Sequence, residues 1–145
     1  MQISHNQYGR GDASFQAAGG EEGIRQLVDS FYDLMRDNLS YQKIWFWHPG
    51  AGDKEESRDK LARFLCSWTG GPKRYQEKYG GISIPQEAHA HLSVTEVERD
   101  MWLNCMKEAL AKQDYSDEFR NYLLDQLSKP AEMVRRACSV TQDQR

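Results

Sequence analysis

Residues 89–110 of the chain read HAHLSVTEVERDMWLNCMKEAL, and they carry the clearest structural signal in the sequence. Two histidines, His89 and His91, come first, and apolar and small side chains follow them at the spacing of an amphipathic helix. The pattern predicts a helix over residues 94–112, preceded by a loop that carries two imidazoles. The side chains expected on or beside its buried face are Val97, Met101, Trp102, Cys105, Met106 and Ala109.

The rest of the chain shows the same helical periodicity, and no segment of useful length alternates polar and apolar residues as a strand would. The spacing predicts long helices over residues 21–36, 54–69 and 114–138, and shorter helical turns over residues 14–18 and up to Ile44. We therefore expect an all-α protein. The side chains expected in the core of the first and last long helices are Ile24, Leu27, Val28, Phe31, Met35, Phe119, Leu123, Leu127, Val134 and Ala137.

Glycine and proline divide the expected helices. Gly70-Gly71-Pro72 is expected to end the helix over residues 54–69, and Pro130 is expected to kink or split the last helix. Residues 73–88 are polar and contain glycine and proline, which predicts a long loop of the kind that is usually functional. Ser93 or Thr95 is expected to cap the next helix, and Ser93 fits a capping box.

Composition limits the class of protein. A chain of 145 residues with a net charge of −3 is expected to be one domain, and it lacks the basic excess of a nucleic-acid or acidic-membrane binder. We find no apolar run of about 18 residues and no secretory signal, so no membrane span or export is expected. Three cysteines without a CxxC pair are expected to be reduced thiols in the cytoplasm. Polar residues 1–14 are expected to lie outside the core, with the domain over residues 15–140 and a tail over residues 141–145.

The aromatic residues and histidines are compatible with few types of binding site. Four Trp, seven Tyr and five Phe indicate either a large hydrophobic pocket or only a large core. His89 and His91 cannot share one face of a helix, and no Cys or acidic cluster supplies the other ligands of a zinc site. A single histidine can hold a haem iron when apolar walls supply the rest of the binding. By itself, His89 is better interpreted as an ordinary polar loop residue than as a metal ligand.

Three segments carry a resemblance to a known family: GGEEGIRQLVDSFYDLM (residues 19–35), FLCSWTGGPKRYQEKYG (residues 64–80) and the segment over residues 89–110. These segments resemble those of truncated haemoglobins: they stand in the same order and at nearly the same separations. Trp102 indicates group II of that family. Together they cover most of residues 15–127. The resemblance implies two helices packed over two around a b-type haem.

The resemblance also implies roles for individual residues. His89, thirteen residues before Trp102, matches the proximal histidine that binds the iron. Tyr32 matches the distal tyrosine, and Trp102 matches the distal tryptophan whose indole N–H is a second donor. His48 matches a distal position that is usually aromatic or histidine, although Trp47 or Phe46 is an alternative there. The other expected distal residues are Phe31, Ser57 and Leu61, and the expected haem contacts are Phe64, Leu65, Tyr75, Leu92 and Met106.

The sequence departs from the family's pattern around the proximal histidine. The arginines that usually precede it are missing, and the usual Pro-Phe pair after it is replaced by His91-Leu92. His91 is interpreted first as a solvated residue. The alternatives are that it contacts a haem propionate, or that a slip in register makes it the iron ligand. Substitute partners for the propionates are sought among Lys73, Arg74, Tyr75, Lys78 and Tyr79.

The function that these residues imply is reversible binding of oxygen and other small ligands at a pentacoordinate haem iron. Donors from Tyr32 and Trp102, with His48 as a further donor, would make oxygen binding tight, which favours redox chemistry on nitric oxide or peroxide over bulk transport. Such a peroxidase-like or dioxygenase-like activity would need a reductase that the sequence does not identify. The alternatives are a haem-based sensor or storage module without turnover, and a haem-free helical interaction protein.

Overall fold

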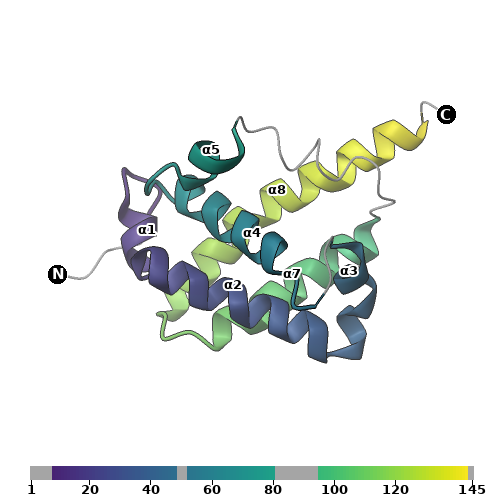
Figure 1. Cartoon of the computed structure of the whole chain (residues 1–145), viewed down its shortest axis with the longest axis horizontal. Coiled ribbons are helices and arrows are strands. Elements are labelled where there is room, and N and C mark those ends of the chain that lie inside the picture. The colour runs from purple at the N-terminus through teal and green to yellow at the C-terminus, as the bar shows by residue number, and fades with distance from the viewer. Residues whose placement is uncertain (1–7, 49–51, 81–94, 144–145) are drawn as a thin grey trace.

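The computed structural model describes residues 8–48, 52–80 and 95–143, and within these ranges every regular element is helical (Figure 1). The all-α prediction is confirmed. Among the described residues, no helix is long and apolar enough to cross a membrane. In chain order the elements are α1 (Ala13–Ala17), α2 (Gly20–Asp37), the 3₁₀ turn η2 (Leu39–Tyr41), α3 (Gln42–Trp47), α4 (Glu55–Trp68), α5 (Arg74–Tyr79), α7 (Glu96–Ala111) and α8 (Asp117–Asp143).

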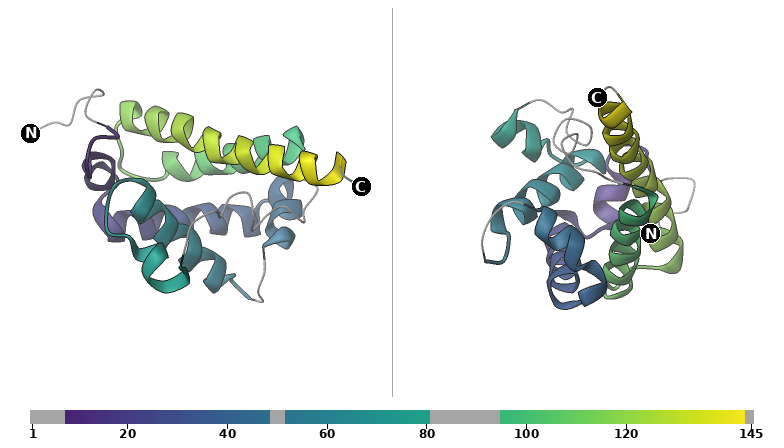
Figure 2. Two further views of the ribbon diagram at one scale, coloured as in Figure 1. Left: turned by 90° about the horizontal axis from the view of Figure 1, so that it is seen from above. Right: turned by 90° about the vertical axis from the view of Figure 1, so that its right-hand side faces the viewer.

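Four long helices form two packed pairs. Helix α2 packs on α4, α7 packs on α8, and α2 also contacts α7, which joins the two pairs (Figure 2). The expected arrangement of two helices over two is confirmed. The apolar face predicted for the first long helix lies at the centre of this arrangement, because Ile24, Leu27, Val28, Phe31 and Met35 are almost completely buried. Burial of such side chains stabilises the fold by about 1.5–3 kcal/mol each.

Several local expectations need correction. The predicted loop over residues 73–88 contains the helix α5, and Pro130 lies inside α8 without splitting it. The capping box at the start of α7 is made by Thr95 and Glu98, whose side chains bond each other's backbone N–H groups; Ser93 lies outside the described residues. Val97, which was expected on the buried face, is 65% exposed because it lies in the first turn, on the solvent side.

The Gly70-Gly71 pair ends α4 in a hydrogen-bonded turn. Gly70 adopts a left-handed φ of 93°, its N–H bonds the carbonyl of Ser67, and the Gly71 N–H bonds the carbonyl of Cys66. These two bonds are those of a Schellman motif. A Cβ on Gly70 would lie 1.9 Å from the carbonyl oxygen of Gly11, so the N-terminal segment passes directly against this turn.

The N-terminal segment therefore packs on the core over residues 8–14, in contrast to the expected extension over residues 1–14. The ring of Tyr8 contacts Phe119 and Tyr122 of α8, with centroid distances of 5.3 Å and 4.9 Å. Ser14 is buried, and its hydroxyl oxygen accepts a 3.0 Å hydrogen bond from the Gly9 N–H. The polar composition of this segment concealed the one aromatic anchor, which contacts a helix more than a hundred residues later.

We expect Gly70→Ala to lower the free energy of unfolding more than Gly80→Ala does. Both glycines have a positive φ, which costs a residue with a Cβ about 1–3 kcal/mol. At Gly80 an added Cβ meets nothing within 4 Å, whereas at Gly70 it meets the Gly11 backbone. Urea denaturation of both variants measures the difference; equal losses would contradict the close approach of residues 11 and 70.

Candidate functional site

A chain of ring contacts joins α7, α2 and the end of α3. Trp102 of α7 packs edge-to-face on Phe31 of α2 with a centroid distance of 5.1 Å, and Phe31 packs on Tyr32 at 5.3 Å. Tyr32 in turn packs on the imidazole of His48, directly after α3, at 5.1 Å and 84°. The buried Phe31 thus joins the indole of Trp102 to the phenol of Tyr32, and the phenol in turn contacts the imidazole of His48.

Tyr32 is buried, and its phenol is neutral. Its hydroxyl donates a long 3.4 Å hydrogen bond to the backbone carbonyl of Ser57, in the first turn of α4. Burial raises the pKa of the Tyr32 phenol well above its usual range, and the nearby Arg58 charge opposes part of that rise. The phenol therefore stays protonated at neutral pH. Because its present bond to Ser57 is long, turning the hydroxyl toward another acceptor costs little.

The contact of His48 with Ile44 decides which imidazole nitrogen carries the proton. Its Nδ1 lies 2.7 Å from the backbone carbonyl oxygen of Ile44, four residues earlier. A carbonyl oxygen only accepts hydrogen bonds, so Nδ1 must carry the hydrogen. The neutral imidazole then presents Nε2 as an acceptor, and it donates from Nε2 only when protonated. The expectation that His48 supplies a further donor is therefore restricted to its protonated form. The alternative Phe46 is exposed.

Arg58 lies beside the Tyr32 ring of this cluster, and the sequence analysis did not predict it as a site residue. The guanidinium of Arg58 in α4 donates to Asp29 and Asp33 of α2 at 3.1 Å and 2.8 Å, and to the backbone carbonyl of Asp53 at 2.6 Å. Its side chain is only 11% exposed, and its carbon Cζ lies 5.6 Å from the ring centroid of Tyr32. A signal was present in the sequence, since the two aspartates are spaced four apart on α2 and Arg58 falls on the buried face of α4.

We expect Arg58→Met to destabilise the fold by about 2 kcal/mol, because it removes charge-assisted hydrogen bonds and leaves two carboxylates close together. The matched control is Arg36→Met, which removes an arginine that pairs with Asp37 and Asp53 on the surface. Exposed pairs contribute little, so this control is expected to unfold close to the wild type. The test is chemical denaturation of both variants, and equal losses would contradict a special role for the buried guanidinium.

The apolar side chains expected to contact a ligand fall on two faces of α4. Leu61, Phe64 and Trp68 form a half-buried stripe, in which the rings of Phe64 and Trp68 stack at 6.4 Å. Leu65, by contrast, is completely buried on the side that packs on α2, as is Met106 in α7. The stripe continues the face that carries Ser57, and Trp68 extends it by a residue that was not among the expected haem contacts.

The residues expected around the proximal histidine are described only in part. His89, His91 and Leu92 lie outside the described residues. Tyr75 is buried in α5 and packs on Tyr79 at 5.0 Å. In the described part of the chain, no group of three or more His, Cys, Asp or Glu side chains could hold a metal ion.

Three of the five substitute propionate partners, Arg74, Lys78 and Tyr79, already have carboxylate partners in the protein. Arg74 pairs with Glu21 at 2.6 Å and with Glu77 at 3.2 Å. Lys78 and the Tyr79 hydroxyl both bond Asp59 of α4, at 2.9 Å and 2.7 Å. These contacts fasten α5 to α2 and α4, which is a structural role that the sequence analysis did not assign to them.

Comparison with known proteins decides the family. The model of the bacterial-like globin family matches residues 13–136 of the chain. The chain belongs to this family. The group 2 truncated hemoglobin YjbI of Bacillus subtilis (strain 168) is 31% identical over 120 residues, which cover 83% of this globin and 86% of that protein.

Solved structures agree with this membership. The group II 2-on-2 hemoglobin of Agrobacterium tumefaciens superposes with a TM-score of 0.76 and 25% identity, covering 84% of this chain and 92% of that one. The truncated oxygen-avid haemoglobin of Bacillus subtilis superposes with a TM-score of 0.72 and 30% identity, covering 84% and 98%. The resemblance to group II truncated haemoglobins is thereby confirmed.

Membership of the globin family implies a haem cofactor and small gaseous ligands. The described residues of this globin fit such a group. Tyr32, Trp102 and His48 gather polar hydrogen-bonding groups at one place, and the half-buried stripe of Leu61, Phe64 and Trp68 is an apolar wall of the kind that a macrocycle needs.

Proposed function

We propose that this globin binds haem b through His89 and reversibly binds oxygen, with Tyr32 and Trp102 as the donors that hold the ligand. The observation that carries the proposal is the buried, neutral Tyr32 phenol, linked through Phe31 to Trp102 and packed on His48. The haem supplies the iron coordination site for the ligand. In this proposal His89 would supply the imidazole that holds the iron, Tyr32 and Trp102 would supply two neutral donors, and the stripe of Leu61, Phe64 and Trp68 would supply an apolar wall.

Each distal side chain has a separate task in this proposal. The Tyr32 hydroxyl turns from the Ser57 carbonyl toward the ligand, since its 3.4 Å bond there is weak. The Trp102 indole N–H donates from the α7 side, and its ring restricts entry. His48 fixes the Tyr32 ring by edge-to-face contact, because its own Nδ1–H is committed to Ile44. Each neutral donor contributes about 0.5–1.5 kcal/mol to ligand retention.

Retention by two donors favours slow release, and slow release suits chemistry on the bound ligand better than transport. We propose nitric oxide or peroxide as the reacting partner, with electrons supplied by a reductase. A relative described as oxygen-avid, 30% identical to this chain, supports the tight-binding part of the proposal. We also propose a cytoplasmic location, supported by the free thiols of Cys66 and Cys105.

Absorption spectra of the purified full chain test the proposal. A Soret band in the ferric, ferrous and carbon monoxide forms, with one haem per chain, is the expected result. Protein that takes up no haem on titration with hemin would leave the haem-free alternative standing. Turnover of nitric oxide or peroxide with an added reductant then separates redox chemistry from a sensor or storage role, because those roles need binding without turnover.

A further inference from the structure

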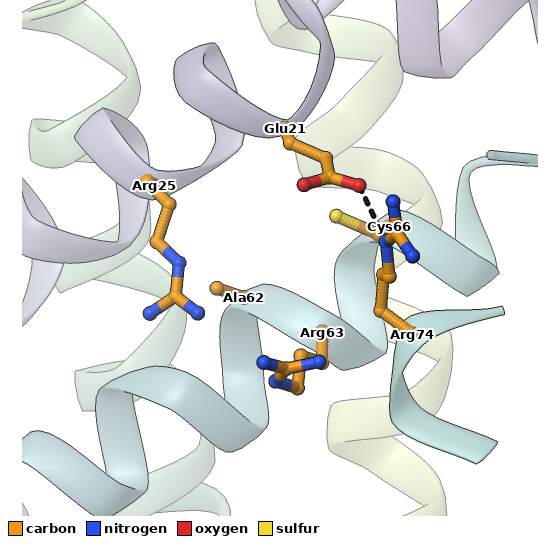
Figure 3. A pocket seen from close by; sticks show the side chains of 6 residues that line it. All are labelled: Glu21, Arg25, Ala62, Arg63, Cys66 and Arg74. Carbon is orange, nitrogen blue, oxygen red and sulfur yellow. Dashed lines mark hydrogen bonds and ion pairs between the residues drawn. The ribbon is translucent and has the colours of Figure 1, made fainter. Parts of the chain in front are cut away.

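A polar pocket lies on the side of α4 opposite the Leu61–Phe64 stripe. Its volume is about 210 Å³, and it is formed where α2, α4 and α5 meet (Figure 3). Arg25 and Arg74 lie on opposite sides of the pocket in this view, with Arg63 below them and the Cys66 thiol between. The full lining is Glu21, Arg25, Ala62, Arg63, Cys66 and Arg74.

The charge around this pocket is positive on a chain whose net charge is −3. Three guanidinium groups and one carboxylate line it. Arg74 pairs with the carboxylates of Glu21 and Glu77. Arg25 and Arg63 share a single carboxylate, that of Asp59, with Lys78, so four cations face three carboxylates. Burial raises the pKa of the Cys66 thiol, so this wall adds no negative charge at neutral pH.

The arginines keep donor groups that the protein does not use. Arg63 bonds Asp59 through its Nε alone, and within the described part of the chain neither of its Nη atoms has a hydrogen-bond partner. Within the described residues, Arg74 donates hydrogen bonds from Nε and Nη1, and Arg25 donates from Nη2 alone. Planar guanidinium groups with free N–H pairs match the oxygen atoms of phosphate and similar oxyanions.

We propose that this pocket binds a small oxyanion of the phosphate class, held by Arg25, Arg63 and Arg74. The bound anion would bridge α2, α4 and α5 and so strengthen the attachment of α5. The proposal does not depend on haem, since the pocket and the half-buried stripe lie on opposite sides of α4.

Isothermal titration of the full chain with inorganic phosphate, at an ionic strength held constant with sodium chloride, tests this site. We expect saturable binding to the wild type and at least tenfold weaker binding to Arg63→Gln. A tenfold change corresponds to about 1.4 kcal/mol. Arg63→Gln is expected to fold, because Asp59 keeps Arg25, Lys78 and Tyr79. Arg63→Lys keeps the charge and loses the planar fork, so its affinity is expected to lie between those of the other two proteins.

The matched control is Arg136→Gln, which removes an arginine from a pair at the same spacing of four residues, with Glu132 on α8. This variant is expected to bind phosphate as the wild type does. The absence of saturable binding to the wild type would overturn the proposal, and so would equal weakening in Arg63→Gln and Arg136→Gln, which would indicate general charge screening. If Arg63→Gln melts early without phosphate, Arg63→Lys alone decides, and unchanged affinity there would overturn the role of the guanidinium fork.

Discussion

Replacing His89 with alanine is expected to remove most of the haem from the protein, whereas His91→Ala is expected to retain it. A globin haem is held to the chain by one axial imidazole, and the apolar walls alone bind it more weakly. We propose His89 for that role on the resemblance to truncated haemoglobins, in which it matches the proximal histidine thirteen residues before Trp102. The Soret absorbance relative to protein, after titration with one equivalent of hemin, measures the retained haem.

A pair of controls makes this experiment specific. His91 lies two residues away and has the same side chain, so it controls for the loss of any imidazole in this segment. Adding free imidazole to His89→Gly is expected to restore the spectrum of the wild type, which a merely unfolded variant would not do. Equal loss of haem in both alanine variants, or loss in His91→Ala alone, would reject the assignment.

The second large effect concerns oxygen release. Tyr32→Phe removes only the hydroxyl, and it is expected to speed oxygen dissociation roughly tenfold, as the loss of a donor worth about 1.4 kcal/mol requires. Trp102→Phe is also expected to speed dissociation. Because it removes a large ring, it is further expected to raise the rate of carbon monoxide association, which depends less on hydrogen bonds. Stopped-flow measurements on the wild type, both single variants and the double variant provide all four comparisons.

The double variant tests whether the two donors act together. Phe31 packs on both rings, at 5.3 Å from Tyr32 and 5.1 Å from Trp102, and both donors serve one acceptor, so their effects are expected not to add. His48→Leu is the useful control, because His48 touches Tyr32 but has its Nδ1–H bonded to Ile44. Unchanged oxygen release in Tyr32→Phe would exclude that hydroxyl from ligand binding and would favour His48.

The features that sequence predicted well are those with a local cause. The spacing of the apolar residues in α2 predicted its buried face, and the glycine pair after α4 predicted the end of that helix. Helix α5 was missed because its six residues are held by distant partners: Asp59 bonds Lys78 and Tyr79, and the Ser67 hydroxyl bonds Gln76. Short segments of this kind owe their structure to tertiary contacts that propensity does not record.

Some residues of the candidate site could likewise be predicted from the sequence, and others could not. Tyr32 and Trp102 could be named from a family resemblance, and their separation by one phenylalanine agrees with a shared role. Arg58 was missed because an arginine reads as a surface residue until its two aspartate partners, far earlier in the chain, are seen beside it. The proton position on His48 depends on a backbone carbonyl, and no pattern of residue types reveals such a contact.

The packing of Tyr8 on α8 has a consequence for the order of folding. Its partners Phe119 and Tyr122 lie more than a hundred residues away, and the Gly11 backbone meets the turn that ends α4. The α8 surface does not exist until most of the chain has been synthesised, and the turn at Gly70 does not exist until about half of it has been. Closing such long loops is entropically slow. The stretch from Tyr8 to Gly11 therefore leaves the ribosome early and reaches its native contacts late, behind helices that are made long after it.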